Sequence, residues 1–340
     1  MTKRWMLIMT FLAATTVRAQ MPLHKKIYIA GHQGLVGRAI ERALRAMGYK
    51  NIVTFTREEL DLRDQQQVFT MFNRERPDYI FLAAAKVGGI VANRDYPAEF
   101  IYDNLMIEAN IIHAAYRFNA KKLLFLGSSC IYPRDCPQPI KEEYLLSGPL
   151  ESTNDAYAVA KIAGITLCQA YNRQYGANFI SCMPTNLYGS FDNFDLHNSH
   201  VLPALLRKVY EAKQCGDDHF VVWGSGTPYR EFLFVDDLAD ACIFLMNTYE
   251  GNDIINIGTG KDITIKELAH IIKEVVGFEG DIIWDRTKPD GTPRKLLDVS
   301  RLSELGWQAT TSLREGIQKT LEWCCQKHIF GYEAREDVRP

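Results

Sequence analysis

The sequence predicts an α/β protein built on a doubly wound parallel sheet, followed by a smaller mixed α/β region. Two observations support this prediction. Between residues 26 and 186, short apolar runs alternate with segments long enough for crossover helices, which is typical of a parallel sheet covered on both faces. After Asn186 the alternation stops, and loops rich in Asn, Asp, Gly and Pro separate the remaining elements.

The individual elements follow from apolar spacing. Strands are expected at residues 27–30, 52–55, 79–85, 122–126 and 179–183. Helices are expected after residue 34 and at residues 153–175, 201–213 and 265–276, where apolar side chains recur every three or four positions. Residues 231–245 predict a strand that leads into a helix returning to the first region. These elements describe a Rossmann-type sheet with a second, smaller unit.

A glycine-rich turn separates the first expected strand from the first helix. Its GxxGxxG spacing permits a tight turn whose backbone amides, at a helix N-terminus, can bind a pyrophosphate. The candidate cofactor ligands in this turn are Gly31, His32, Gln33, Gly34, Leu35, Val36 and Gly37.

The residue after the second strand indicates which dinucleotide binds. NAD-binding proteins carry an acidic residue at the end of this strand, whereas this chain has Arg57. A guanidinium favours a phosphate, so we predict NADP(H) bound through its 2′-phosphate. A solvated loop arginine is the alternative interpretation of Arg57.

Tyr157 and Lys161 form the candidate hydride-transfer pair. They lie four residues apart on one expected helix and therefore share a face. A nearby ammonium favours the phenolate, so we expect the pair to deliver a proton to a carbonyl as hydride arrives. Ser128 follows the strand at residues 122–126, at the sheet edge where ligands bind in such folds. A turn or cap serine is the alternative.

Together these features resemble the extended short-chain dehydrogenase/reductase family over nearly all of the chain after Met21. Within it, residues 30–32, 127–133, 183–189, 198–201 and 288–297 are similar to the GDP-L-fucose synthases. The resemblance implies an NADPH-dependent enzyme that epimerises GDP-4-keto-6-deoxy-D-mannose at C3 and C5 and reduces it at C4. It also implies a homodimer that packs helices near residues 98–118 and 152–175.

The resemblance assigns roles to individual residues. Ser128, Tyr157 and Lys161 support reduction, while Cys130 is the base and His200 the acid of epimerisation. Without it, a buried structural cysteine and a loop histidine are the alternatives. Further expected cofactor contacts are Leu126, Gly127, Ser128, Ser129, Lys161, Pro184, Thr185, Asn186, Leu187 and His200.

Expected substrate contacts lie in the C-terminal half. The resemblance points to Lys208, Trp223, Arg230, Asp290 and Lys295, a set suited to apolar cover and to diphosphate charge. A core role for Trp223 and surface roles for the lysines are the alternatives. Family members often carry arginine where this chain has Gln33, so we expect NADPH to be preferred and NADH to be usable.

Charge and cysteine usage exclude other classes of function. A net charge of −2 gives no general attraction to nucleic acid or to a membrane. The eight cysteines show no metal-ligand spacing and no disulfide pattern, so we predict reduced thiols and no metal. Two rival hypotheses remain: a nucleotide-sugar 4-epimerase or 4,6-dehydratase, which would regenerate its cofactor, and a non-catalytic NADP-binding protein.

The expected organisation has four parts: a leader or extended start at residues 1–24, an NADP-binding domain at 25–190 with a returning segment near 229–258, a mainly substrate-binding domain at 191–330, and a tail at 331–340. Residues 1–20 resemble a secretory signal. However, the predicted chemistry uses cytosolic NADPH and a nucleotide sugar, so an extended start and a cytoplasmic location are favoured.

Overall fold

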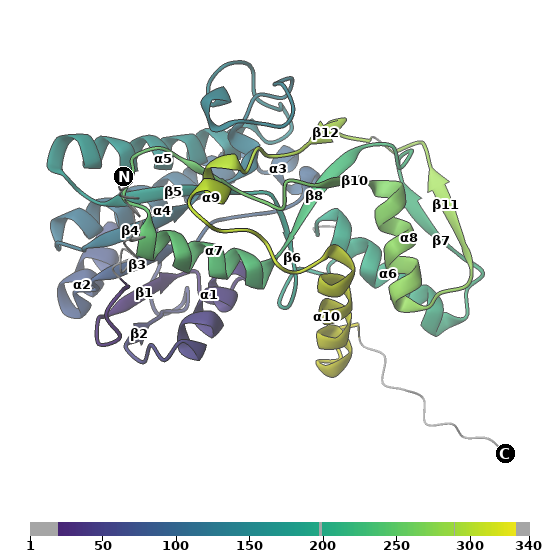
Figure 1. The fold of residues 1–340 in the computed structure, drawn as a ribbon, viewed down its shortest axis with the longest axis horizontal. Helices are drawn as coiled ribbons and strands as arrows, with labels where there is room; N and C mark the ends of the chain where they lie inside the picture. The colour runs from purple at the N-terminus through teal and green to yellow at the C-terminus, as the bar shows by residue number, and fades with distance from the viewer. Residues whose placement is uncertain (1–19, 197–198, 289, 331–340) are drawn as a thin grey trace, which may run out of the picture.

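The computed structural model describes residues 20–196, 199–288 and 290–330. Residues 1–19 of the signal-like segment and the predicted tail at residues 331–340 therefore lie outside the described residues. The described chain forms two lobes, a large sheet covered by helices and a smaller lobe that carries α6, α8 and α10 (Figure 1). No helix within the described ranges is long and apolar enough to cross a membrane.

The large lobe contains six parallel strands in the order β2-β1-β3-β4-β5-β9. They are β1 (Ile27–Ala30), β2 (Ile52–Val53), β3 (Tyr79–Leu82), β4 (Lys122–Leu126), β5 (Phe179–Pro184) and β9 (Ile255–Ile257). The predicted doubly wound α/β fold is confirmed. β3 is shorter than expected because its partner β1 ends at Ala30, opposite Leu82, where the chain enters the glycine turn.

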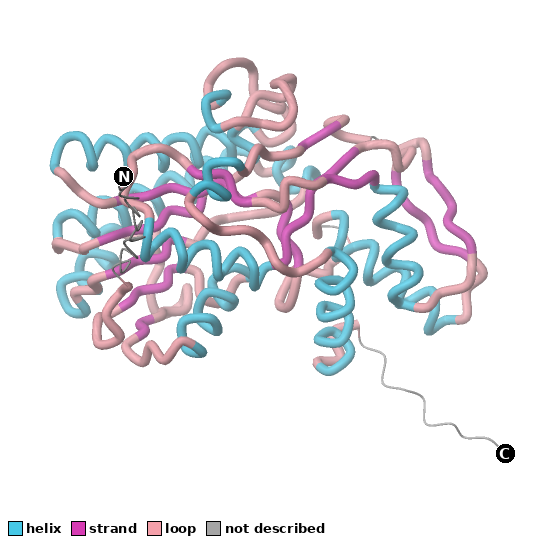
Figure 2. Tube along the Cα trace, in the orientation of Figure 1, coloured by secondary structure: helices cyan, strands magenta, loops and turns pink. Residues whose placement is uncertain are grey.

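Alternating side chains divide the sheet into two apolar faces. Ile27 and Ile29 belong to one core with helices α1 and α7, whereas Tyr28 and Ala30 belong to a second core with α2, α4 and α5. Figure 2 shows helices on both sides of the strands. The bounds of these helices are α1 (Leu35–Ala46), α2 (Gln65–Glu75), α4 (Pro97–Arg117), α5 (Asp155–Tyr175) and α7 (Val235–Thr248).

The chain returns to the large lobe late in the sequence. α7 packs against α1, and β9 pairs with β5 to complete the sheet. Met21, which the sequence places in the leader segment, is only 3% exposed and belongs to the first core. Its backbone N–H donates to Asn247 on α7, and its carbonyl accepts from the Tyr49 hydroxyl. The folded unit thus includes Met21.

The smaller lobe contains a mixed sheet, a two-stranded parallel pair and three helices around their own core. Its strands are β6 (Asn186–Tyr188), β7 (His219–Trp223), β8 (Tyr229–Phe234), β10 (Asp262–Thr264), β11 (Asp281–Asp285) and β12 (Arg294–Lys295). Its helices are α6 (Val201–Cys215), α8 (Ile265–Val276) and α10 (Leu313–Gln326). The remaining helical segments are α3 (Ile90–Asp95), α9 (Ser300–Glu304), η1 (Ser129–Ile131) and η2 (Glu142–Tyr144).

The buried Glu231 on β8 connects the two lobes. Its carboxylate accepts from the backbone N–H groups of Thr259 at 2.6 Å, Gly260 at 2.7 Å and Leu297 at 3.1 Å. The carbonyl of Glu231 accepts from the Asn186 side chain at 2.8 Å. These bonds hold β8 and β12 at the carboxyl end of β5, where the lobes meet.

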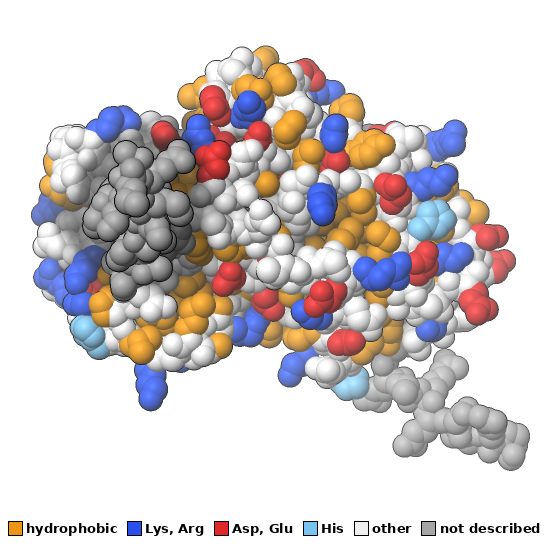
Figure 3. Space-filling view, viewed as in Figure 1, with side chains coloured by type: hydrophobic (Ala, Val, Ile, Leu, Met, Phe, Trp, Pro, Cys, Tyr) orange, Lys and Arg blue, Asp and Glu red, His pale blue; other side chains and the backbone are white. Residues whose placement is uncertain are grey.

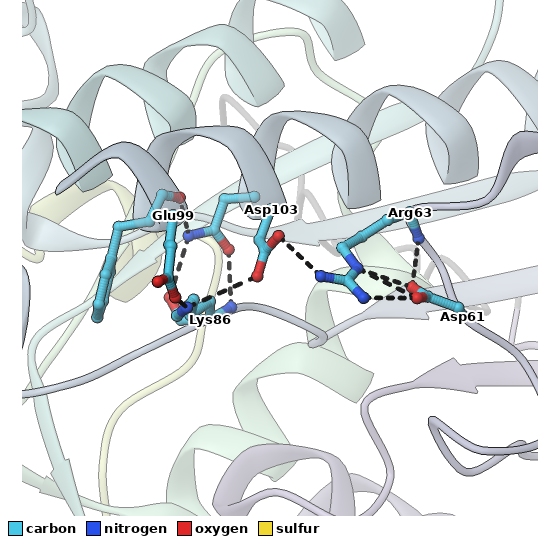
Figure 4. A network of polar contacts seen from close by, with 7 residues as sticks. Asp61, Arg63, Lys86, Glu99 and Asp103 are labelled. Carbon is cyan, nitrogen blue, oxygen red and sulfur yellow. Dashed lines mark hydrogen bonds and ion pairs between the residues drawn. The ribbon is translucent and has the colours of Figure 1, made fainter. Parts of the chain in front are cut away.

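An ion-pair network fixes the loops after β2 and β3 against α4 (Figure 4). The Arg63 guanidinium lies 2.7 Å from the Asp61 carboxylate and 3.1 Å from the Asp103 carboxylate. Lys86 pairs with Glu99. The guanidinium of Arg63 lowers the pKa of Asp61 to about 2. On the face in Figure 3, basic and acidic side chains are interspersed over both lobes, so that face presents no field of a single sign.

Candidate active site

The glycine turn after β1 leaves the N-terminus of α1 open. Gly31 has a φ of +85°, and a Cβ there would lie 2.7 Å from the backbone of Ala84. A Cβ on Gly37 would lie 2.2 Å from the Gly31 carbonyl oxygen. Gly34 caps α1 without a side-chain hydrogen bond, and the first turn holds no acidic residue. The helix end can therefore receive an anion.

Two alanine substitutions separate the roles of these glycines. A Cβ on Gly34 meets its nearest atom at 3.5 Å, so we expect Gly34→Ala to fold normally but to bind a dinucleotide diphosphate less tightly. The added methyl group in Gly37→Ala would push the backbone at Gly31 away from α1. We expect this variant to lower the free energy of unfolding by about 1–3 kcal/mol. Urea unfolding and NADPH titration measure the two effects. Equal stability of the two variants would contradict this assignment.

Arg57 lies in the turn after β2 and is exposed. Within the described ranges it makes no hydrogen bond and no ion pair, so its guanidinium is available to a phosphate. Gln33 lies in the glycine turn, and its carbonyl accepts from Arg38 at 2.9 Å. Because this bond uses only the backbone of Gln33, it leaves the Gln33 amide uncommitted.

The hydride-transfer residues meet at the carboxyl end of β4. Tyr157 and Lys161 lie on α5, and the Lys161 ammonium donates to the Leu126 carbonyl at 3.0 Å and lies 5.8 Å from the centre of the Tyr157 ring. Ser128 is the N-cap residue of η1, and its hydroxyl lies close enough to Tyr157 to lower the pKa of that phenol. The structure therefore brings together the three residues that the sequence placed on separate elements.

Lys161 is not free to stabilise a Tyr157 phenolate. Its ammonium pairs with Glu108 of α4 at 3.1 Å, and both side chains are almost wholly buried. Burial raises the pKa of Tyr157, and the negative charges of Cys130 and Glu108 raise it further, against a smaller lowering by Ser128. These effects favour the protonated form of Tyr157, as a proton donor requires, and the expected effect of Lys161 on the phenolate stays a prediction.

Cys130 lies beside a lysine from the other lobe. The Lys295 ammonium on β12 contacts the Cys130 sulfur at 3.5 Å. Burial alone raises the pKa of the Cys130 thiol, but Lys295 and hydrogen bonds from Ser128 and Asn154 outweigh it, so that this pKa lies below its ordinary value. Cys130 is thus prepared to act as a thiolate base.

His200 is the N-cap residue of α6 and is exposed to solvent. The protein around its other sides lowers the pKa of the imidazole through lost hydration, and the positive charge of Lys295 lowers it further. Lys295, predicted as a substrate contact, thus acts electrostatically on both Cys130 and His200. The sequence did not indicate this connection.

Trp223 presents an aromatic face in the smaller lobe. Trp223 is the last residue of β7 and is 53% exposed, which excludes the alternative that it is a core residue. The ammonium groups of Lys208 and Lys288 lie 5.1 Å and 5.3 Å from the centre of its ring. Lys208 also donates to the Val221 carbonyl at 3.2 Å. A flat ring flanked by two cations can stack on a base next to phosphates.

Arg230 and Asp290 lie on neighbouring parts of the same lobe. Arg230 pairs in register with Lys295 across β8 and β12, and burial lowers its pKa. Asp290 accepts from the Ser225 N–H at 2.6 Å and from its hydroxyl at 2.8 Å. Asp290 therefore holds the turn that follows Trp223, and any contact with a substrate would be additional to this structural bond.

Comparison with known proteins identifies the family. The model of the NAD dependent epimerase/dehydratase family matches residues 27–258. The chain belongs to this family. The match begins at β1 and ends after β9, so it spans the sheet, the glycine turn and the Tyr157 helix. The predicted resemblance to extended short-chain dehydrogenases is thereby confirmed.

Relatives within this epimerase/dehydratase family are similar over most of their length. GDP-L-fucose synthase 1 of Arabidopsis thaliana is 59% identical over 88% of this chain and 92% of its own. GDP-L-fucose synthase of Escherichia coli is 56% identical over 88% of this chain and 96% of its own. A GDP-L-fucose synthetase structure from Naegleria fowleri, bound to NADP, has a TM-score of 0.85 at 31% identity and covers 91% of this chain and 97% of its own.

Three polar residues of the site were missed by the sequence analysis. Asn154 precedes α5, and its position as a helix N-cap was a usable local signal. Glu108 and Lys288 carry no such signal, because their partners Lys161 and Trp223 are distant in the sequence. Only the packing of α4 on α5 and the pairing of β11 with β7 place them in this epimerase/dehydratase site.

Proposed function

We propose that this chain converts GDP-4-keto-6-deoxy-D-mannose to GDP-L-fucose, by epimerisation at C3 and C5 followed by NADPH-dependent reduction at C4. One observation carries the proposal: Cys130, with its lowered pKa, lies against Lys295 and next to the Ser128–Tyr157 pair. The site thus combines a carbon base with a proton donor for a ketone. The relatives of 56% and 59% identity, both named GDP-L-fucose synthase, support it.

In the proposed epimerisation, the Cys130 thiolate removes the proton next to the C4 ketone and the electrons form an enolate. His200 returns a proton to the same carbon from the opposite face, which inverts it. Once Cys130 has released its proton to solvent and His200 has taken one up, the same two steps invert the second carbon. The positive charge of Lys295 stabilises the thiolate. Burial and the charge of Lys295 lower the pKa of His200, which makes its imidazolium a stronger acid and leaves a smaller share of the side chain protonated.

In the proposed reduction, Tyr157 gives its proton to the C4 oxygen while Ser128 orients the reacting oxygen through a second hydrogen bond. The reduced nicotinamide supplies the hydride for C4 when the cofactor is bound. The residues present fit such a cofactor, because the open N-terminus of α1 suits a diphosphate and Arg57 suits a 2′-phosphate. Lys161, whose ammonium contacts the Leu126 carbonyl and Glu108, is the residue that would hold the nicotinamide ribose.

The smaller lobe is proposed to bind the GDP group. Guanine would stack on the exposed face of Trp223, and Lys208, Lys288 and Arg230 would neutralise the diphosphate. Pro184 to Leu187 lie at the carboxyl end of β5, where they would contact the nicotinamide half of a bound cofactor. The division into two domains near residue 190 remains a proposal. A cytoplasmic location is also proposed, because the reaction consumes NADPH and a nucleotide sugar.

Oxidation of NADPH followed at 340 nm, with product configuration determined by NMR, tests the proposed function. Stoichiometric oxidation that yields GDP-L-fucose is the expected result. Reduction without inversion would remove the roles of Cys130 and His200. Turnover without net oxidation would favour a 4-epimerase or 4,6-dehydratase, and cofactor binding without turnover would favour a non-catalytic protein.

Arg57→Ala should raise the KM for NADPH roughly tenfold and leave that for NADH unchanged, because it removes a charged hydrogen bond to the 2′-phosphate. Gln33→Arg should act in the opposite direction by adding such a bond. Initial rates with both cofactors check the two results, and NADH serves as the internal control. An equal change for NADPH and NADH would show that Arg57 does not distinguish them.

A homodimer is proposed through α4 and α5, which pack on each other along their length. Exposed apolar side chains on these helices support this surface: Tyr102 on α4, and Val159 and Tyr175 on α5. Burying them against a second copy would remove apolar area from water. Light scattering should give twice the mass of the chain, and Tyr102→Asp together with Val159→Asp should give one chain mass.

A further inference from the structure

Glu108 is a buried carboxylate that faces the helix of the proposed proton donor. It lies on α4, is 1% exposed, and its oxygen is 3.1 Å from the Lys161 ammonium. Within the described ranges no hydrogen-bond donor other than Lys161 reaches either carboxylate oxygen. Its charge therefore acts on α5, the helix that carries Lys161 and Tyr157.

The neighbouring helix leaves room for this carboxylate. A Cβ on Gly164 of α5 would lie 2.7 Å from the second Glu108 oxygen and 2.5 Å from the Phe125 ring. The Lys161 ammonium lies 4.7 Å from the centre of the same ring and donates to the Leu126 carbonyl. Glycine at position 164 thus allows Glu108 and Lys161 to meet against the end of β4.

A buried ion pair of this kind stabilises a fold no more than apolar side chains of the same size would. Its consequence is instead chemical. A lone Lys161 ammonium near the Tyr157 ring would favour loss of the phenolic proton, whereas an ionised Glu108 opposes it. Burial raises the pKa of Glu108, and the charge of Lys161 and its hydrogen bond lower it again to a smaller extent. Burial and the charges of Cys130 and Glu108 raise the pKa of Tyr157.

We propose that Glu108 is a positioning residue for the reduction: it holds Lys161 against β4 and neutralises its charge, so that Tyr157 keeps its proton until a ketone accepts it. This inference rests on the reductase activity proposed above. Glu108 acts through Lys161 and touches neither substrate nor the reacting atoms.

Other charged and titratable groups face this cluster from η1, β12 and α5. Tyr157 faces Ser128 and Cys130 from the η1 turn, and Cys130 in turn faces Lys295 of β12. Glu108 also faces Cys168 of α5. Burial raises the pKa of Cys168 to about 12, so this thiol stays neutral across the range in which activity is measured.

The test is the pH dependence of kcat for NADPH oxidation in the full chain. In the wild type, kcat should stay high up to high pH. In Glu108→Gln, kcat should fall at a pH at least about one unit lower, because the uncompensated Lys161 ammonium favours the Tyr157 phenolate. Glu75→Gln is the matched control. Its ion pair with Lys26 also measures 3.1 Å but lies at the opposite, N-terminal end of β1.

The outcomes separate this inference from the proposed function. A uniform loss of rate in Glu108→Gln, with an unmoved basic limb, would mean a purely structural role and overturn the inference. If Glu108→Gln does not fold, Glu108→Asp replaces it, with a smaller shift of the same sign expected and an unmoved limb again overturning it. Wild type that oxidises no NADPH at any pH would remove the proposed function, and the inference with it.

Discussion

Tyr157→Phe is expected to lower the rate of C4 reduction by about 10²–10⁴-fold, because it removes the proton donor and leaves the rest of the site in place. The ring remains packed edge-on against Phe100, at a centroid distance of 6.3 Å, so the fold should not change. Proton exchange at C3 and C5 should continue, since Cys130 and His200 are untouched. NADPH oxidation and deuterium uptake from D₂O measure the two reactions separately.

Tyr171→Phe is the control for this variant. It lies on the same helix, and its hydroxyl contacts the His113 ring at 2.5 Å instead of the site. Its reduction rate should equal that of the wild type. Loss of deuterium uptake together with reduction in Tyr157→Phe would show that the tyrosine serves both reactions or supports the geometry of Cys130.

Cys130→Ser is expected to slow deuterium uptake at C3 and C5 by about 10²–10⁴-fold, because a serine hydroxyl does not ionise in the working pH range. Reduction of an already epimerised 4-keto sugar should persist, since Ser128, Tyr157 and Lys161 are unchanged. Cys136→Ser, six residues along the same loop, is the control and should behave as wild type. Full exchange in Cys130→Ser would exclude the cysteine as the base.

Lys295→Met extends this prediction to pH. Lys295 lowers the pKa of Cys130, so its removal should raise that pKa and move the acidic limb of the exchange rate to higher pH by about one unit. The sign follows because the thiolate, which is the active base, then forms only at higher pH. The pKa of His200 should rise as well, since Lys295 lowers it. An unmoved acidic limb would mean that Lys295 serves the substrate alone.

Much of the large lobe could be predicted because its signals are local. The run at residues 122–126 and the helix at residues 265–276 have the predicted bounds, since apolar periodicity continues through them and ends at recognisable residues. The strand expected at residues 52–55 ends instead at Val53. Strand length depends on a partner, and no periodicity in one segment reports where the neighbouring strand stops.

The sequence by itself determined the groups whose geometry is set within one turn or one helix. The GxxGxxG turn follows from the backbone freedom of glycine, and the Tyr157–Lys161 pair follows from helical spacing. Tertiary structure decided their electrostatics. Lys295 reaches Cys130 because β12 pairs with β8, and Glu108 reaches Lys161 because α4 packs on α5. Charges act through space, so the protonation states of Cys130 and Tyr157 depend on contacts between segments that only folding brings together.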